Sequence, residues 1–191
     1  DDDELYFQDG AGTNTVLLKG GTHSMWIPAE GISPRSNAGC ADLATTAAAS
    51  AGQPDIRALA FDKTTDEHAQ FTIAMPNLWN KGTLTAQFYW TTTGSSNDVI
   101  WGIQAVAMSN DDPFGAAFGT AQTVTDTTLA AKDVRITAAT SAMTVGGSPA
   151  NDDMITFQVY RDANAGGDNL DADALLLGIK IFYTVDSGND A

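Results

Sequence analysis

The chain has 191 residues and a formal net charge of −15, the balance of 24 acidic residues against nine lysines and arginines. The basic residues are scattered along the sequence, whereas nucleic-acid-binding proteins cluster them to neutralise phosphates, so DNA, RNA and anionic membrane surfaces are excluded as partners. A chain of this length buries roughly 70% of the surface that it exposes when unfolded, which predicts one domain with a substantial core.

Residues 1–22 predict an extended N-terminal segment ahead of a single domain at residues 23–191. An acidic run is followed by Leu5, Tyr6 and Phe7 and then by a glycine-rich stretch, a composition that cannot bury a core of its own. The three apolar side chains either pack on their own domain or anchor the protein to a partner, and the sequence leaves both interpretations open.

The sequence of the first part of the domain predicts strands that are separated by a long loop. Residues 25–28 form a strand that ends at Pro28, because proline cannot donate to a ladder. Residues 29–54 are irregular and rich in small residues, which makes this loop the first candidate for a contact between subunits. Residues 57–61 and 69–75 predict a pair of strands around the turn at residues 62–66.

Residues 82–107 carry the strongest pattern and predict two long strands joined as an antiparallel hairpin. Apolar residues recur at every second position of both strands. They are Leu84, Ala86, Phe88 and Trp90 in the first strand, and Val99, Trp101, Ile103, Ala105 and Ala107 in the second. A hairpin alone is marginally stable in water, so further strands must cover its apolar face.

The remainder predicts one short helix and several strands. Asp112 as N-cap and Pro113 at the first helical position predict the helix. Strands are predicted at residues 120–125, 133–137, 142–145, 154–160 and 173–185. The last is apolar on both faces, which is typical of a central strand or of one that contacts another subunit. Together these strands predict an all-β fold, an antiparallel β-sandwich of jelly-roll type with long loops.

No motif for catalysis is present. The sequence has no nucleophile elbow, zinc-binding histidine pair, phosphate loop or dinucleotide fingerprint. His23 and His68 lie on separate predicted strands without a neighbouring nucleophile, and Cys40 is the only cysteine, which excludes a disulfide framework. The loop aspartates are explained by turns and solubility better than by a glycosidase pair. The sequence therefore predicts a protein that is not an enzyme and that needs no cofactor.

Two kinds of binding site remain open. Trp79, Tyr89 and Tyr160 are candidates for stacking on a glycan, whereas alternation places Trp90 and Trp101 in the core. In the loop at residues 162–173, oxygen-bearing side chains partly follow the spacing of a calcium loop. They are Asp162, Asn164, Asp168 and Asp173 at positions one, three, seven and twelve. Glycine at position five and strands on both sides favour instead a hairpin loop capped by its own side chains.

Three segments resemble virion proteins of tailed bacteriophages, in particular the terminal domains of head fibres and tail fibres. The segments are residues 75–90, 99–127 and 155–184. The residues that carry the resemblance are Trp101, Asp111, Asp112, Phe118, Gly119, Thr120, Arg161, Asp162, Asp168, Leu170, Asp173, Ala174 and Gly178. The insertion Gly166-Gly167 departs from the usual spacing, so no ligand role for this loop carries over.

The resemblance implies a non-enzymatic structural protein of the virion, assembled in the host cytoplasm. It implies a homo-oligomer, expected to be a trimer, that contacts other virion proteins as capsid decoration, head fibre or tail-fibre component. The alternative function is a carbohydrate-binding module, or a receptor-binding tip, that recognises host surface glycans. The two are compatible, since the tip of a fibre can serve both.

Overall fold

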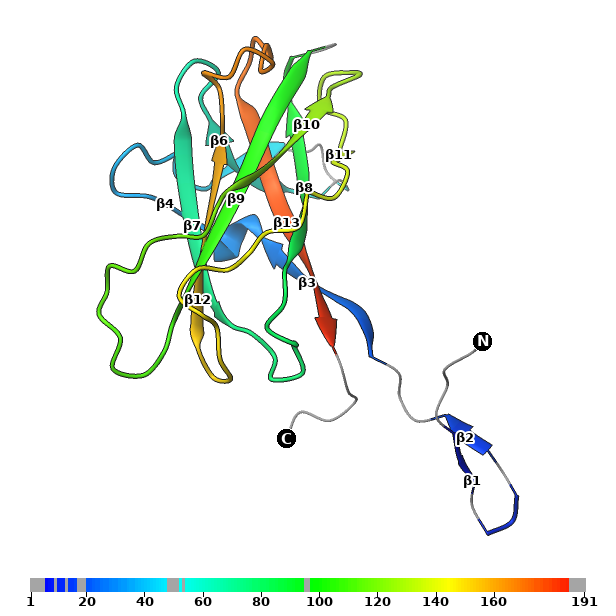
Figure 1. Cartoon of the computed structure of the whole chain (residues 1–191). Helices are drawn as coiled ribbons and strands as arrows, with labels where there is room; N and C mark the ends of the chain where they lie inside the picture. The colour runs from blue at the N-terminus through cyan, green and yellow to red at the C-terminus, as the bar shows by residue number, and fades with distance from the viewer. Residues whose placement is uncertain are drawn as a thin grey trace.

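Two antiparallel sheets lie face to face and form a β-sandwich, as the alternating sequence predicts (Figure 1). The computed structural model describes residues 6–8, 10–12, 14–16, 20–47, 52, 54–94 and 97–185. Its elements in chain order are β1 (Tyr6–Gln8), β2 (Asn14–Val16), β3 (Gly21–Pro28), the 3₁₀ turn η1 (Ala29–Gly31), β4 (Ser33–Pro34), β5 (Ala44–Ala47), β6 (Ile56–Phe61), β7 (Glu67–Ala74), β8 (Thr85–Thr92), β9 (Asp98–Met108), β10 (Gln122–Thr127), β11 (Arg135–Ile136), β12 (Met154–Arg161) and β13 (Ala174–Val185).

The five-stranded sheet has the order β10-β9-β12-β7-β4, and the six-stranded sheet has β11-β8-β13-β6-β5 with β3 added beside β13. In Figure 1, β9 of the first sheet passes in front of β13 of the second. β1 and β2 form a separate two-stranded sheet, in which Tyr6 pairs with Val16 and Phe7 with Thr15. Leu5, the third predicted anchor residue, lies outside the described residues. No helix in the described parts of the chain is long and apolar enough to cross a membrane.

At residues 82–107 the predicted alternation of apolar residues is right, but the predicted pairing of the two strands as a hairpin is wrong. β8 pairs with β13 and β11, whereas β9 pairs with β12 and β10, so the two strands belong to opposite sheets. Period-two alternation identifies the apolar face of each strand but not its neighbour. β6 and β7 likewise belong to opposite sheets instead of forming the predicted pair.

Two local predictions also differ from the structure. The predicted helix at Asp112 is a turn, because the Asp112 carboxylate accepts a hydrogen bond from the Ser109 N–H at 2.9 Å and Gly115 has a positive φ of 152°. The predicted long loop at residues 29–54 contains η1, β4 and β5, of which β5 pairs with β6. Main-chain pairing at the sheet edges therefore orders parts of this stretch despite its small side chains.

β13 is central, which is one of the two positions that the apolar character of both its faces predicts. It pairs with β8 on one side and with β6 and then β3 on the other. A β-bulge between Leu176 and Gly178 shifts the alternation by one residue. Leu176 and Ile179 consequently both point inward and are fully buried, whereas Leu175 and Leu177 are only half-buried.

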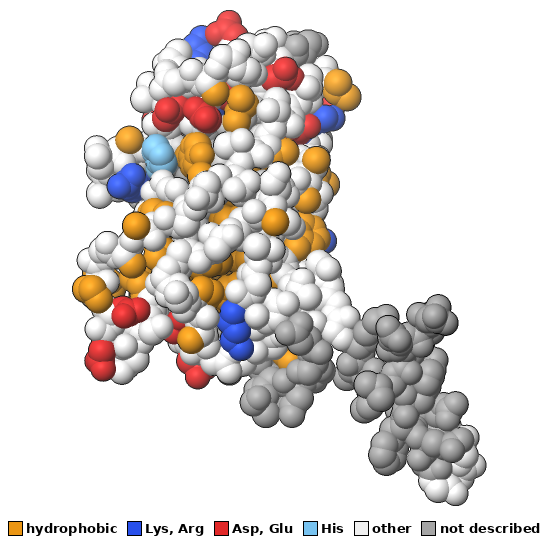
Figure 2. All heavy atoms as spheres, viewed as in Figure 1, with side chains coloured by type: hydrophobic (Ala, Val, Ile, Leu, Met, Phe, Trp, Pro, Cys, Tyr) orange, Lys and Arg blue, Asp and Glu red, His pale blue; other side chains and the backbone are white. Residues whose placement is uncertain are grey.

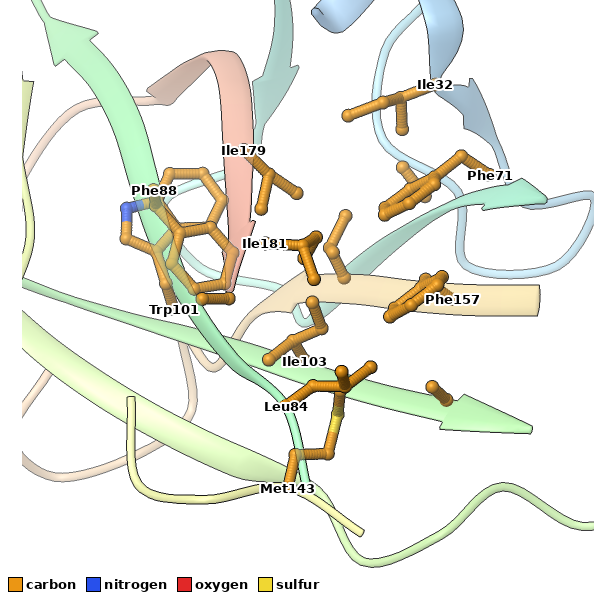
Figure 3. Close-up of a cluster of buried hydrophobic side chains, with 14 of the residues drawn as sticks. Ile32, Phe71, Leu84, Phe88, Trp101, Ile103, Met143, Phe157, Ile179 and Ile181 are labelled. Carbon is orange, nitrogen blue, oxygen red and sulfur yellow. The ribbon is translucent and has the colours of Figure 1, made fainter. Parts of the chain in front are cut away.

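The core fills the space between the sheets with large side chains from both (Figure 3). Trp101 of β9 lies at its centre, with its ring stacked on Phe88 of β8 at 5.4 Å and set edge-on to Phe61 of β6 at 5.1 Å. Met143, outside the named strands, closes one side of the core through a bridge to Leu84. β8 and β9 therefore contact each other through aromatic side chains across the core, and not through main-chain pairing within one sheet.

Candidate functional site

The structure separates the three residues predicted to bind glycan. Trp79 is only 2% exposed within the core, so its ring presents no face to a sugar and serves packing instead. Tyr89 lies on the outer face of the six-stranded sheet, and Tyr160 lies on the outer face of the five-stranded sheet. Tyr89 and Tyr160 therefore belong to two different surfaces.

The outer face of the five-stranded sheet carries three cross-strand rows that hold no acidic residue, lysine or arginine, and we call this surface the amide face. Strand register places them opposite one another. The rows are Thr123, Gly102, Tyr160 and His68; Gln104, Gln158, Gln70 and Ser33; and Val106, Thr156 and Thr72. The chain holds 33 charged residues, 24 acidic and nine basic, yet none belongs to these rows. In Figure 2, acidic and basic atoms gather toward the ends and margins of this face.

An aromatic ring lies directly on the backbone in the first row. A Cβ atom added to Gly102 would be 2.2 Å from the Cζ atom of Tyr160, so the ring occupies the space above this glycine. His68 stacks on the other side of Tyr160, at a centroid distance of 5.4 Å and an interplanar angle of 29°. Burial, with smaller contributions from Asp162 and Asp66, raises the pKa of the Tyr160 hydroxyl, which stays protonated at neutral pH.

The second and third rows supply polar groups at fixed positions. Gln70 donates from Nε2 to Oε1 of Gln158 at 3.2 Å, and the hydroxyls of Thr72 and Thr156 lie 3.0 Å apart. Gln158 is buried at 3% exposure and therefore orients its neighbour, whereas Gln70 and Gln104 are half-buried and reach solvent. An amide offers both donors and acceptors, so this row can match an array of hydroxyl groups.

The amide face was only partly predictable. Tyr160 was identified as a candidate, whereas His68 and the glutamines were not. The alternation of residues 154–160 contains the missed signal, because Gln158 and Tyr160 share the polar face of a strand whose other face is apolar. The other two glutamines become neighbours of Gln158 only through pairing of β12 with β7 and β9.

On the outer face of the six-stranded sheet, Tyr89 contacts a residue that the sequence analysis treated only as part of a strand. Trp26 is 47% exposed and meets Tyr89 edge-on at a ring centroid distance of 4.8 Å. Alternation along β3 predicts that Trp26 is exposed. Its neighbours Met25 and Ile27 pack against the core, so Trp26 between them points to the other face.

The loop at residues 162–173 is organised by an ion pair. Arg161 and Asp168 are almost fully buried, and the carboxylate accepts from Arg161 Nη2 at 2.7 Å and from Nε at 3.0 Å. The same carboxylate accepts from the Ile100 N–H, which leaves it committed to protein groups. Within the described residues, no group of three or more histidine, cysteine or acidic side chains comes together in a way that could hold a metal ion. The carboxyl groups of Asp162 and Asp173 and the amide of Asn164 share this loop without forming such a group.

Comparison with known proteins bears on the fold alone. No protein-family model matches the sequence, and no curated protein matches it.

Among solved structures, one similar chain is the family 11 carbohydrate-binding module from Clostridium thermocellum in complex with a β-1,3-1,4-mixed-linked tetrasaccharide. Its TM-score is 0.38 and its identity 13%, and 96% of each chain is covered. A second is infectious bursal disease virus, Gx strain, with a TM-score of 0.34, 10% identity and 93% of this chain covered against 35% of that one. A third is a Shewanella oneidensis protein of unknown function, with a TM-score of 0.30, 13% identity, and 92% and 91% of the two chains covered. At these scores the similarity is no argument for a shared function.

Proposed function

We propose that this protein is a non-enzymatic carbohydrate-binding protein that holds an uncharged glycan on the amide face. The observation that carries the proposal is a hydrogen-bonding surface without acidic residues, lysine or arginine, on which the Tyr160 ring lies over Gly102. Such a surface suits a ligand that is rich in hydroxyl groups and carries no charge. The rows themselves hold no acidic residue, lysine or arginine that would have to be desolvated, and Asp66 and Asp162 near Tyr160 disfavour an anionic ligand.

The chemistry of the three rows supports this function. The apolar face of a sugar ring packs on an aromatic ring, while its hydroxyl groups pair with side-chain amides at the edge of the ring. The stacked rings of Tyr160 and His68 supply the aromatic surface, and Gln70 and Gln104 supply amides one row away. Since residues of one face recur about 7 Å apart along a strand, the two rows are spaced to contact one sugar or two consecutive sugars.

A binding role also suits His68. Its ring stacks on Tyr160, and Nδ1 lies 3.3 Å from the carbonyl oxygen of Ala38. These contacts position the ring beside the tyrosine instead of directing it toward a nucleophile, as general-base catalysis requires.

Removing the tyrosine ring should abolish most of the binding. We expect Tyr160→Ala to weaken the affinity for neutral polysaccharide by about tenfold, since aromatic contacts contribute about 0.5–1.5 kcal/mol beyond area burial and 1.4 kcal/mol is tenfold. Gly102→Ala should have a similar effect although it keeps the tyrosine, because the added Cβ displaces the ring. Affinity electrophoresis in gels that contain mixed-linkage glucan, mannan or dextran measures both variants.

The matched control is Phe114→Ala, which removes an aromatic ring that is 91% exposed and lies outside the strands. This variant should migrate as the unmodified protein does in every gel. If the unmodified protein binds none of the neutral polysaccharides, or if Tyr160→Ala binds them as well as Phe114→Ala does, the amide face is not a glycan site.

A second candidate function is a structural subunit of a tailed-phage virion, which the resemblance of the sequence suggests. The exposed apolar residues of the six-stranded sheet favour it. Ile56 is 37% exposed and Val134 is 64% exposed, and both line a hollow of about 90 Å³ together with Leu175 and Leu177. Apolar side chains of this kind are suited to a contact between subunits, and the predicted trimer would bury them.

Immunogold electron microscopy of intact particles tests the virion role. Label over the head is expected for capsid decoration or a head fibre, and label at the tail tip is expected for a fibre that also recognises host glycans. Lysate that contains the protein while particles carry no label would contradict the virion role and leave the glycan function standing alone.

A further inference from the structure

The outer face of the six-stranded sheet carries an aromatic cluster around one lysine, and we call Trp26, Tyr89, Phe182 and Lys180 the aromatic face. Trp26 is 47% exposed and touches Tyr89 edge-on. A Cβ atom on Gly178 would lie 2.4 Å from the Cη2 and Cζ2 atoms of Trp26, so the indole extends over this glycine. The outer surface of each sheet therefore has an aromatic side chain placed over a strand glycine.

Lys180 stands in the middle of this cluster. Strand register places it between Trp26 of β3 and Gln87 of β8, and its Nζ atom lies 5.3 Å from the ring centroid of Phe182. The ion pairs found in the described part of the chain involve Lys63, Arg135 and Arg161, and none involves Lys180.

Among the described strand positions that share the surface of Lys180, none is acidic. The positions that share this face are Thr22, Ser24 and Trp26 on β3, Thr85, Gln87 and Tyr89 on β8, and Gly178, Phe182 and Thr184 on β13. Although the chain has 24 acidic residues, the half-buried Lys180 has no carboxylate partner within the described part of the structure and lies beside aromatic rings instead.

We propose that the aromatic face is a second binding site, separate from the amide face, for a sugar that bears a single carboxylate or sulfate group. Trp26 and Tyr89 supply the stacking surface, and the Lys180 ammonium pairs with the anionic group. Gln87 donates from Nε2 to the carbonyl oxygen of Thr137, which fixes its amide beside the lysine. The net charge of −15 repels long polyanions, so one acidic sugar in an otherwise neutral glycan is the expected ligand.

The test uses oligosaccharides that differ by one acidic group. Calorimetric titrations of the full chain compare 3′-sialyllactose, lactose 6-sulfate and lactose. At least one acidic probe should bind at least about tenfold more tightly than lactose, because charge-assisted hydrogen bonds are roughly twice as strong as neutral ones. Lys180→Gln should reduce this preference to near unity, Lys180→Arg should keep it, and Trp26→Ala should remove the tighter binding of the acidic probes.

Phe114→Ala, which removes an exposed ring outside both proposed sites, is the matched control and should leave these titrations unchanged. The proposal is overturned if neither acidic probe binds better than lactose, or if Lys180→Gln keeps the preference. It is also overturned if Trp26→Ala binds normally but changes the mass in solution by light scattering, which would make the face a contact between copies of this chain. Because the amide face is tested with neutral polysaccharides and Tyr160, failure of either site leaves the other standing.

Discussion

Asp168→Asn should destabilise the folded protein by about 3–5 kcal/mol, the usual cost of removing one partner from a buried ion pair. Arg161 is 0% exposed and the Asp168 side chain is 1% exposed, so the arginine charge left behind has no access to water. Since single domains are stable by about 5–15 kcal/mol in total, the loss is a large fraction of the stability.

The position of the Arg161–Asp168 ion pair explains its large expected contribution to the stability of the fold. Arg161 ends β12 and donates to the carbonyl oxygens of Leu170 and Ala172 at 2.8 Å each, which ties down the loop that leads into β13. Asp168 accepts from the Ile100 N–H at 3.0 Å and so connects the same loop to β9. Loss of the carboxylate therefore loosens the junction between the two sheets as well as leaving a charge unpaired.

Urea unfolding followed by tryptophan fluorescence measures the effect. The matched control is Asp171→Asn in the same loop, where the carboxylate is 82% exposed and pairs with Lys63 at 2.5 Å. Exposed ion pairs contribute little, so this control should unfold at nearly the urea concentration of the unmodified protein. Equal midpoints for the two variants would show that the buried pair does not stabilise the fold.

Trp101→Ala should have an effect of similar size, about 3–5 kcal/mol, from the loss of buried area and the cavity that remains. The Trp101 ring is fully buried and contacts Phe61, Phe88 and Trp90, three aromatic residues of the opposite sheet. No other residue makes so many aromatic contacts between the sheets in the described structure.

A conservative variant separates packing from hydrogen bonding. The Nε1 atom of Trp101 is buried without a hydrogen-bond partner, so Trp101→Phe removes a polar group that gains nothing from its surroundings. We expect Trp101→Phe to cost clearly less than Trp101→Ala in urea unfolding, and Phe114→Ala to cost nothing measurable. A Trp101→Phe loss as large as that of Trp101→Ala would mean that the shape of the indole, and not its apolar area, holds the sheets together.

The sequence alone determined which residues face the core in the strands that alternate without a bulge. Period-two alternation identified the buried faces at residues 84–90 and 99–107, and the apolar character of residues 173–185 indicated a strand that is either central or in contact with another subunit. These features are local, because side-chain direction along a strand depends only on the backbone of that strand.

Strand partners were decided by the tertiary structure, because pairing joins residues far apart in the chain. The predicted hairpin failed for this reason, and so did the grouping of Trp79, Tyr89 and Tyr160 into one set of candidates. The same pairing assembles the row of Gln70, Gln104 and Gln158 from three strands, and sets Lys180 beside Trp26. A sequence pattern identifies the face on which a side chain lies, but only the packing of the two sheets decides which side chains meet there and which are left exposed for a ligand.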